Sequence, residues 1–246
     1  MKIGVAQLNL TEAMEKNAEK IIHFLEKGKE ERLDVLAFPE TALTGYIYDG
    51  FYDLDWGKVT DALARIARCV KGSAVHAVVG TPFRENDTLH NSAVVIFPDG
   101  RQAVYHKNLL VTYEEKYFRA GTQKLVFQAG GHGLGVMICR DQNSPELARE
   151  LKGMGARGMF ILSAHYYGLV ESQMKREKNN ALPLARAYEN NVYVFKANAV
   201  GTIQGKVSYG GSMIIDPRGI TVLRADDRHE ELLACEVDFG RENPRW

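Results

Sequence analysis

The sequence predicts an α/β fold built around a mixed β-sheet, in which parallel and antiparallel strands occur together. Along most of the chain, apolar runs with strand character alternate with segments whose apolar residues recur at helical spacing. Residues 208–238 instead contain short strand-like runs with no helical segment between them, which is typical of hairpins. A turn signal, Pro98-Asp99-Gly100, separates two further strand-like runs.

The first part of the chain begins with a strand at 2–8 and continues into an amphipathic helix at 11–32. The apolar residues that recur at helical spacing in this segment are Met14, Ala18, Ile21, Ile22 and Leu25. A second strand is expected at 34–39. Residues 43–56 are rich in aromatic residues and glycine, and we expect a loop long enough to line a pocket. Leu63, Ile66, Ala67 and Val70 then mark another helix.

The remaining elements continue this alternation. Strands are expected at 74–80, 91–97, 102–107, 158–164 and 192–198, and helices near 145–154 and 171–190. The hairpin-rich end comprises 208–216, 220–225 and 231–238.

The charge balance and the cysteines restrict the class of protein. Lys plus Arg and Asp plus Glu number 31 each, and no basic patch indicates nucleic acid. No apolar segment approaches the ~20 residues that cross a bilayer, and the chain opens directly into strand-like sequence without a signal peptide. Cys69, Cys139 and Cys235 are odd in number and unclustered, which fits a reducing compartment. We expect a cytoplasmic protein without nucleic-acid or membrane partners.

Cys139 stands where an apolar, glycine-punctuated run at 133–138 ends. Polar residues follow, then Pro145 and a helical pattern, so the thiol is expected between a strand and a helix start. Unpaired N–H groups at a helix N-terminus favour thiolate and oxyanion charge, which suits a nucleophile. The alternative is a small buried hydrophobe, the usual fate of a free cysteine.

Two ionisable residues occupy comparable positions. Glu40 directly follows the apolar run 35–39, and Lys107 interrupts the strand-like stretch 104–110. Ionisable groups in apolar surroundings are costly unless they are paired, so they often mark sites. Taken singly, Glu40 could cap a helix and Lys107 could extend from an edge strand. Together with Cys139 they supply a base, a cation and a nucleophile.

Taken in order, these motifs resemble the nitrilase superfamily of carbon–nitrogen hydrolases, which use a Glu-Lys-Cys triad. Phe38-Pro39-Glu40 matches the motif of the general base, His106-Lys107 that of the lysine, and Cys139-x-Asp141 with Pro145-Glu146 that of the nucleophile. The resemblance continues through segments 2–9, 185–190, 197–201, 209–212 and 216–219. Because it runs without a break, we expect one domain over residues 1–246.

The resemblance also implies an architecture and a mechanism. The fold would be a four-layer α-β-β-α sandwich, with two mixed sheets packed face to face. Cys139 would attack the substrate, Glu40 would transfer protons, and Lys107 would stabilise the oxyanion with a backbone N–H after Cys139. A second glutamate follows the lysine in this family, and the spacing from Lys107 and Gly121 favours Glu114 over Glu115. The alternative for Glu114 is a solvated charged loop.

Several residues near these motifs are candidates for lining the substrate pocket: Tyr46, Tyr48, Tyr113, Arg140, Asp141, His165 and Tyr166. The aromatic residues could equally belong to the core, and Asp141 could stabilise a turn or a helix start. Arg140 favours a substrate that carries a carboxylate, although a helix-capping guanidinium is an equal alternative. Asn91 precedes a predicted strand, where we expect it to stabilise a turn.

No metal or cofactor is expected. His132, Cys139 and Asp141 do not form a recognisable ligand set, and the glycines at 130–135 lack the ending of a phosphate-binding loop. The resemblance implies a cofactor-free hydrolase that acts on a small linear amide and releases ammonia. The alternatives are an N-carbamoyl substrate, a nitrile, or a non-catalytic interaction module on the same scaffold. The resemblance implies a homodimer or a larger assembly built from dimers.

Overall fold

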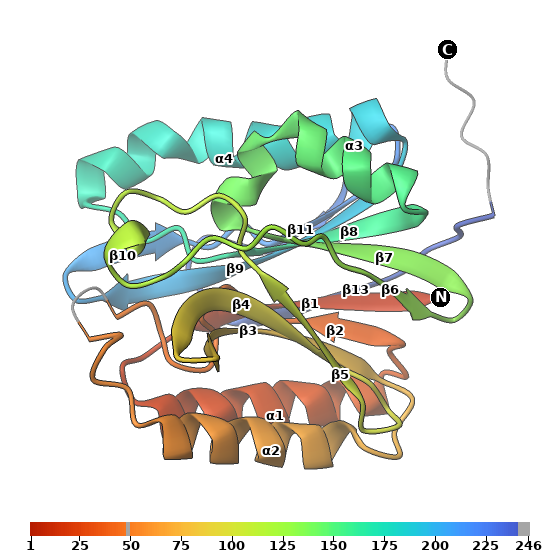
Figure 1. Cartoon of the computed structure of the whole chain (residues 1–246). Helices are drawn as coiled ribbons and strands as arrows, with labels where there is room; N and C mark the ends of the chain where they lie inside the picture. The colour runs from red at the N-terminus through yellow and green to blue at the C-terminus, as the bar shows by residue number, and fades with distance from the viewer. Residues whose placement is uncertain (48–49, 241–246) are drawn as a thin grey trace.

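The computed structural model describes residues 1–47 and 50–240 (Figure 1). Its helices are α1 (Met14–Glu30), α2 (Trp56–Val70), α3 (Pro145–Gly153) and α4 (Leu169–Asn190), with short 3-10 turns η1 (Glu114–Lys116) and η2 (Cys139–Asn143). The strands of the first half are β1 (Lys2–Asn9), β2 (Val35–Ala37), β3 (His76–Glu85), β4 (Thr88–Ile96) and β5 (Gln102–His106). Those that follow are β6 (Val126–Ala129), β7 (His132–Ile138), β8 (Ala156–Ser163), β9 (Tyr193–Ile203), β10 (Lys206–Tyr209), β11 (Met213–Ile215), β12 (Thr221–Arg224) and β13 (Glu231–Glu236).

Hydrogen bonds join the described strands in the continuous order β5-β4-β3-β2-β1-β9-β8-β7-β6. Helix-connected neighbours such as β1 with β2 and β7 with β8 are parallel, whereas turn-connected neighbours such as β3 with β4 are antiparallel. The predicted mixed α/β class is therefore confirmed. Strand β1 pairs with β9 at only two of its residues, Leu8 and Asn9. This short link joins strands β1–β5 to strands β6–β9. The division into two separate sheets stays a prediction.

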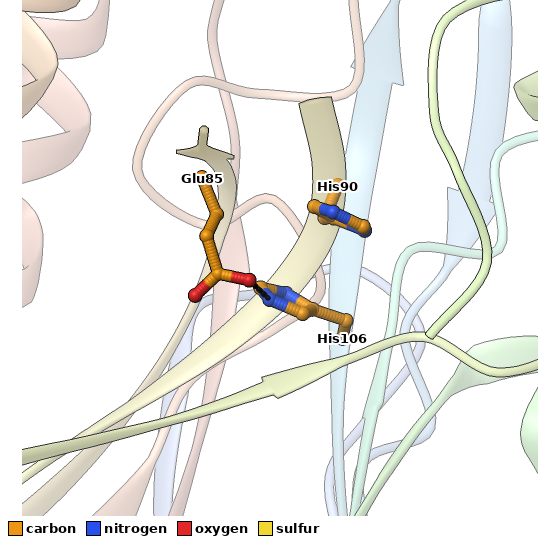
Figure 2. Close-up of side chains that lie close together, drawn as sticks. All are labelled: Glu85, His90 and His106. Carbon is orange, nitrogen blue, oxygen red and sulfur yellow. Dashed lines mark ion pairs between the residues drawn. The ribbon is translucent and has the colours of Figure 1, made fainter. Parts of the chain in front are cut away.

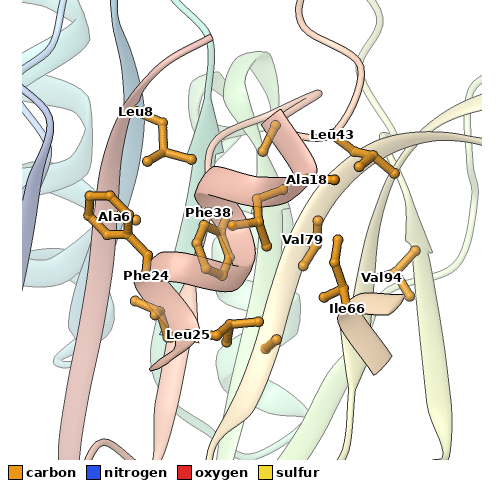
Figure 3. Packing of buried hydrophobic residues seen from close by; sticks show 14 of the residues in the cluster. Ala6, Leu8, Ala18, Phe24, Leu25, Phe38, Leu43, Ile66, Val79 and Val94 are labelled. Atoms are coloured by element: carbon orange, nitrogen blue, oxygen red, sulfur yellow. The ribbon is translucent and has the colours of Figure 1, made fainter. Parts of the chain in front are cut away.

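Figure 1 shows α1 and α2 on one side of the strands and α3 and α4 on the other. Three apolar clusters match this arrangement. One joins α1 and α2 to β1–β4 (Figure 3), the second lies among the strands, and the third joins α3 and α4 to β7–β9 and β11. Because side chains alternate between the faces of a strand, β1 supplies Leu8 to the first cluster and Val5 to the second.

Polar residues start two of the helices where the sequence pattern changes. The Asp55 carboxylate accepts a hydrogen bond from the backbone N–H of Lys58 at the start of α2. Ser144 accepts one from the N–H of Leu147, and Pro145 occupies the first turn of α3. Such caps contribute about 1 kcal/mol each. The cap at Ser144 fixes the end of the turn that begins with Cys139.

The hairpin of β3 and β4 is longer than the predicted strands 74–80 and 91–97. It turns at Asn86 and Asp87, which have positive φ angles of 46° and 64°, as a tight hairpin turn requires. Asn91 therefore lies within a strand, and its predicted turn role is wrong. Strand β6 was not predicted, and Gly210-Gly211 divides the predicted strand 208–216 into β10 and β11.

Across the described parts of the chain, none of the helices combines the length and the apolar character needed to cross a membrane.

Candidate active site

Lys107 occupies the centre of a buried polar cluster. It directly follows β5, and its backbone N–H donates to the carbonyl of Asn91 over 2.8 Å, which holds the residue against β4. The side chain is 1% exposed. Its Nζ lies 2.6 Å from Oε1 of Glu40 and 2.8 Å from Oε2 of Glu114. An ammonium between two carboxylates compensates for part of the cost of burying all three groups.

Glu40 follows β2 in a turn that close backbone packing holds in place. The N–H of Phe38 donates to Val78, and that of Leu43 donates to Gly80. A Cβ atom at Gly80 would lie 2.1 Å from the carbonyl oxygen of Pro39, so only glycine permits this approach. Glu40 is 1% exposed, and its Oε2 accepts a 3.1 Å hydrogen bond from the N–H of Ala164. Residues that directly follow β5 and β8 thus contact both oxygens of the carboxylate.

Glu114 opens the 3-10 turn η1 and is fully buried. Its Oε2 accepts a hydrogen bond from the N–H of Val111, and its Oε1 accepts one from the hydroxyl of Tyr46 at 3.2 Å. The adjacent Glu115 is exposed. The structure therefore brings Glu114, and not Glu115, to Lys107.

Asn91 connects the carboxylates of Glu40 and Glu114. The sequence did not predict this role for Asn91. Its Nδ2 donates to Oε1 of Glu40 and to Oε1 of Glu114, over 2.8 Å in each case. The side chain is fully buried in β4. A polar asparagine inside an otherwise apolar strand could have indicated this role. Recognising it depends on placing the start of β4 before Asn91.

The carboxylates differ in their affinity for protons. Burial raises the pKa of Glu40, and the nearby Glu114 charge adds to this effect, while the Lys107 ammonium opposes it. Burial also acts to raise the pKa of Glu114, but the Lys107 ammonium and its hydrogen bond hold that pKa below the ordinary value. Burial opposes the charge of Lys107, yet the two carboxylates raise its pKa well above the usual range. The arrangement suits Glu40 for proton transfer and keeps Glu114 and Lys107 charged.

Cys139 lies where β7 ends and the η2 turn begins, at the predicted junction, and its thiol is partly buried. Its φ angle is +44°, a left-handed conformation that non-glycine residues seldom adopt and that is typical of strained functional turns. Burial raises the pKa of the thiol, and the hydrogen-bonded Glu40 carboxylate raises it further. The expectation that this position favours the thiolate is therefore wrong for the free site. The thiol needs a base, and Glu40 contacts it.

Asp141 stabilises the turn that begins at Cys139. One carboxylate oxygen accepts from the hydroxyl of Tyr105 at 2.7 Å and from the N–H of Ile138 at 2.9 Å, while the other accepts from the N–H of Leu109 at 2.8 Å. Asp141 is fully buried, and its predicted contact with substrate stays a prediction. Arg186 braces the same turn by donating from Nε to the carbonyl of Gln142.

The other predicted pocket residues differ in where they lie. Tyr46 contacts Glu114, and Tyr113 packs against Tyr117. His165 is buried, stacks on Tyr167, and has a pKa well below the usual value because burial and nearby lysines disfavour its charged form. Arg140 is exposed and lines a separate surface pocket with residues of the 108–120 segment. Tyr166 is buried in the first apolar cluster, and Tyr48 lies outside the described residues.

A cluster of possible metal ligands, not predicted from the sequence, lies beside β5. Figure 2 shows Glu85, His90 and His106, whose ligand atoms lie within 4.8 Å of one another. The two rings stack with centroids 4.0 Å apart and 18° between their planes, so their in-plane lone pairs run side by side and do not converge on one ion. Burial and the neighbouring ring lower the pKa of His106. We interpret this cluster as a support for the end of β5.

Comparison with known proteins shows the family to which this chain belongs. The sequence profile of the carbon–nitrogen hydrolases, described as "Carbon-nitrogen hydrolase", matches residues 2–244. A nitrilase of Pyrococcus abyssi is 32% identical over 97% of this chain and 90% of its own length. A 2-oxoglutaramate amidase of Bacillus subtilis is 30% identical over 91% of this chain and 85% of its own length. The chain belongs to the carbon–nitrogen hydrolase family, within the nitrilase superfamily.

A solved structure supports the fold. An amidase from Nesterenkonia sp. superimposes with a TM-score of 0.87 at 23% sequence identity, covering 96% of this chain and 90% of that protein. Identity at this level shows a shared architecture, and the chemistry of this chain is argued from its own residues.

Proposed function

We propose that this protein hydrolyses a small linear amide by forming a thioester with Cys139 and releasing ammonia. The observation that carries the proposal is the buried cluster of Glu40, Lys107 and Glu114 in contact with a thiol at a strand end. Burying three charged groups costs free energy that a purely structural role would avoid with apolar residues. Membership of the carbon–nitrogen hydrolases supports the same reaction type.

Acylation begins when Glu40 accepts the thiol proton while the sulfur of Cys139 attacks the amide carbon. The resulting oxyanion is stabilised by the Lys107 ammonium and by the backbone N–H that follows Cys139. The tetrahedral intermediate collapses as the C–N bond breaks. Glu40 gives its proton to the departing nitrogen, ammonia leaves, and the acyl group remains on sulfur as a thioester.

Deacylation uses the same groups in reverse. Glu40 removes a proton from water, the hydroxide attacks the thioester carbon, and Lys107 again stabilises the oxyanion. The C–S bond breaks, the product leaves as a carboxylic acid, and the proton returns from Glu40 to sulfur. A carboxyl group performs both transfers best when its pKa is raised toward neutrality, which is the direction that burial gives Glu40.

Glu114 and Asn91 act as positioning residues in this scheme. Glu114 keeps Lys107 charged, and Asn91 holds both carboxylates by their Oε1 atoms. Neither group has to contact the substrate. Their removal should slow the reaction by misplacing the ammonium and the base.

Ammonia release from a panel of simple amides, ω-amides and carbamoyl amines tests the proposal. Mass spectrometry of rapidly quenched protein should show an acyl adduct on Cys139. Turnover without this adduct, or no turnover with any member of the panel, would overturn the proposal. Release of carbon dioxide together with ammonia would identify an N-carbamoyl substrate. An unreactive Cys139 and no turnover would favour a non-catalytic interaction module.

We also propose that the protein forms dimers. Large apolar side chains are exposed on α4, on β12 and directly after α3: Leu169, Val170, Met174, Tyr188, Val222 and Met154. Exposed apolar residues concentrated on neighbouring elements often mark subunit interfaces. Sedimentation of the intact chain tests this assembly, and a fully active monomer would refute it.

A further inference from the structure

A second buried lysine, Lys196, lies on β9 and is absent from the scheme above. It is 1% exposed, and its Nζ donates one hydrogen bond of 3.0 Å, to the carbonyl of Asn179 on α4. Within residues 1–47 and 50–240, no carboxylate forms an ion pair with it. Lys107, by contrast, has two carboxylate partners. Burying an ammonium without a counter-ion costs free energy. Two of the three N–H donors of Lys196 also remain available for a further partner.

Lys196 lines a cavity between α4 and the strands β9 and β10. The volume is about 20 Å³, enough for a group slightly larger than one water molecule. The charged and polar groups around it include Arg176, Asn179, Asn198, Tyr209 and Arg224. No aspartate or glutamate is among the described residues that line it. Arg176 pairs with Asp227, which leaves Lys196 and Arg224 as cations without an acidic partner in the cavity wall.

The cavity adjoins the active site through consecutive residues after β8. The N–H of Ala164 donates to Glu40, while the next residue, His165, lines the cavity and donates from its N–H to Oδ1 of Asn198. The Cys139 thiolate would favour the charged form of Lys196, so the two groups are close enough to interact electrostatically. Burial lowers the pKa of Lys196 to about 7, as expected for an ammonium that lacks an anion.

We propose that this cavity binds a carboxylate at the far end of the amide substrate, with Lys196 as its main charge partner. The inference rests on the proposed amidase function and narrows its substrates to linear monoamides of dicarboxylic acids. The carboxylate fills the small cationic cavity and supplies the missing counter-ion. The amide at the other end of the molecule then extends toward Cys139. Uncharged amides of equal length leave Lys196 unpaired and bind more weakly.

The kinetic test compares matched pairs of substrates, succinamate with butanamide and glutaramate with pentanamide. The wild-type protein should favour at least one acidic amide by about tenfold or more in kcat/KM, which corresponds to about 1.4 kcal/mol. Lys196→Met should remove this preference by raising KM for the acidic amide much more than KM for the neutral amide. Retained turnover of the neutral amide demonstrates that the variant is folded. Lys178→Met, at an exposed position on α4, is the control and should behave as the wild type.

A binding measurement separates this inference from the proposed function. Calorimetry should detect succinamate or glutaramate binding to the Cys139→Ala variant, and the additional Lys196→Met change should weaken that binding at least tenfold. Amide hydrolysis with no preference for acidic substrates, or a preference that survives Lys196→Met, would overturn the inference and leave the amidase function standing. If no amide is hydrolysed, the amidase function fails, and binding of neither acid to the Cys139→Ala variant would overturn the inference as well.

Discussion

The ammonium of Lys107 lies 2.6 Å from Oε1 of Glu40, and both side chains are 1% exposed. In the proposed mechanism this contact aligns the base with the cation that stabilises the oxyanion, while the Lys107 charge opposes proton uptake by Glu40. Glu114 resolves this conflict because it shares the ammonium and remains ionised. The proposed mechanism therefore uses Glu40 for proton transfer and Glu114 for charge balance.

Glu114→Gln should lower kcat/KM by about 100-fold or more without unfolding the protein, because Lys107 loses the carboxylate that keeps it charged and aimed. Glu115→Gln is the matched control and should retain wild-type activity, since Glu115 is exposed. Steady-state kinetics and circular dichroism check both variants. The reverse order of activities would show that the charge-balancing role belongs to Glu115.

Cys139→Ala should abolish turnover and leave the melting temperature within a few degrees of the wild-type value, because the change removes only the sulfur atom of a partly buried side chain. Calorimetry and an ammonia assay measure the two quantities. Residual turnover above about one thousandth of the wild-type rate would exclude Cys139 as the nucleophile.

Glu40→Gln should eliminate hydrolysis but preserve alkylation of Cys139. The rate of hydrolysis should fall by at least about 100-fold, because no group remains to transfer protons. The Glu40 carboxylate raises the pKa of the thiol, so its removal should shift iodoacetamide labelling of Cys139 to lower pH. Peptide mapping can follow the rate of iodoacetamide labelling at each cysteine.

Cys69 and Cys235 are internal controls for this labelling, because burial raises the pKa of each thiol and neither contacts Glu40. Cys69 contacts Glu26 and Lys29. Substrate should protect Cys139 in the wild-type protein. Preferential labelling of Cys69 without loss of activity, or an unchanged pH profile at Cys139 in Glu40→Gln, would contradict the assignment.

Asn91→Asp should move the acidic limb of the kcat/KM profile to higher pH. A third carboxylate beside Glu40 raises the pKa of that base further, so a higher pH is needed before it can accept the thiol proton. The charge-matched control is Asn86→Asp at the exposed hairpin turn, a position where aspartate also tolerates a positive φ. A profile that stays in place for Asn91→Asp would mean that Asn91 has no influence on the base.

Lys196→Met should stabilise the unliganded protein by about 1–4 kcal/mol at pH 6, because an unpaired buried charge is replaced by an apolar side chain. The pKa of Lys196 falls from 10.5 to about 7 on folding. Below pH 7 the lysine is charged in both states and the full burial cost is present. Between pH 7 and 10.5 the folded protein releases the proton and the cost declines. The stabilisation should therefore shrink as the pH rises.

Denaturant titrations of both proteins at pH 6 and pH 9 measure this difference, with Lys178→Met as the exposed control. Equal stabilisation at both pH values would show that folding does not lower the pKa of Lys196. A destabilised Lys196→Met variant at pH 6 would show that Lys196 is paired or solvated in the native state.

The sequence by itself located Glu40, Lys107 and Cys139, because each residue interrupts or ends an apolar run that local periodicity marks as a strand. The alternation of helices with strands and the late hairpins likewise specified the mixed α/β class. These features are local, since the alternation of side chains along a strand is set by covalent geometry and is visible within a few residues.

The tertiary structure decided which groups meet and what their charges do. Glu114 and Glu115 are adjacent in a polar run, and only the fold buries one against Lys107 while exposing the other. Asn91 reaches both carboxylates because β4 begins three residues before it. Lys196 lies within an apolar strand and Lys107 directly follows one, yet the fold leaves Lys196 without a carboxylate. Burial and distance between residues remote in sequence control desolvation and Coulomb energies, and neither quantity is encoded in local spacing.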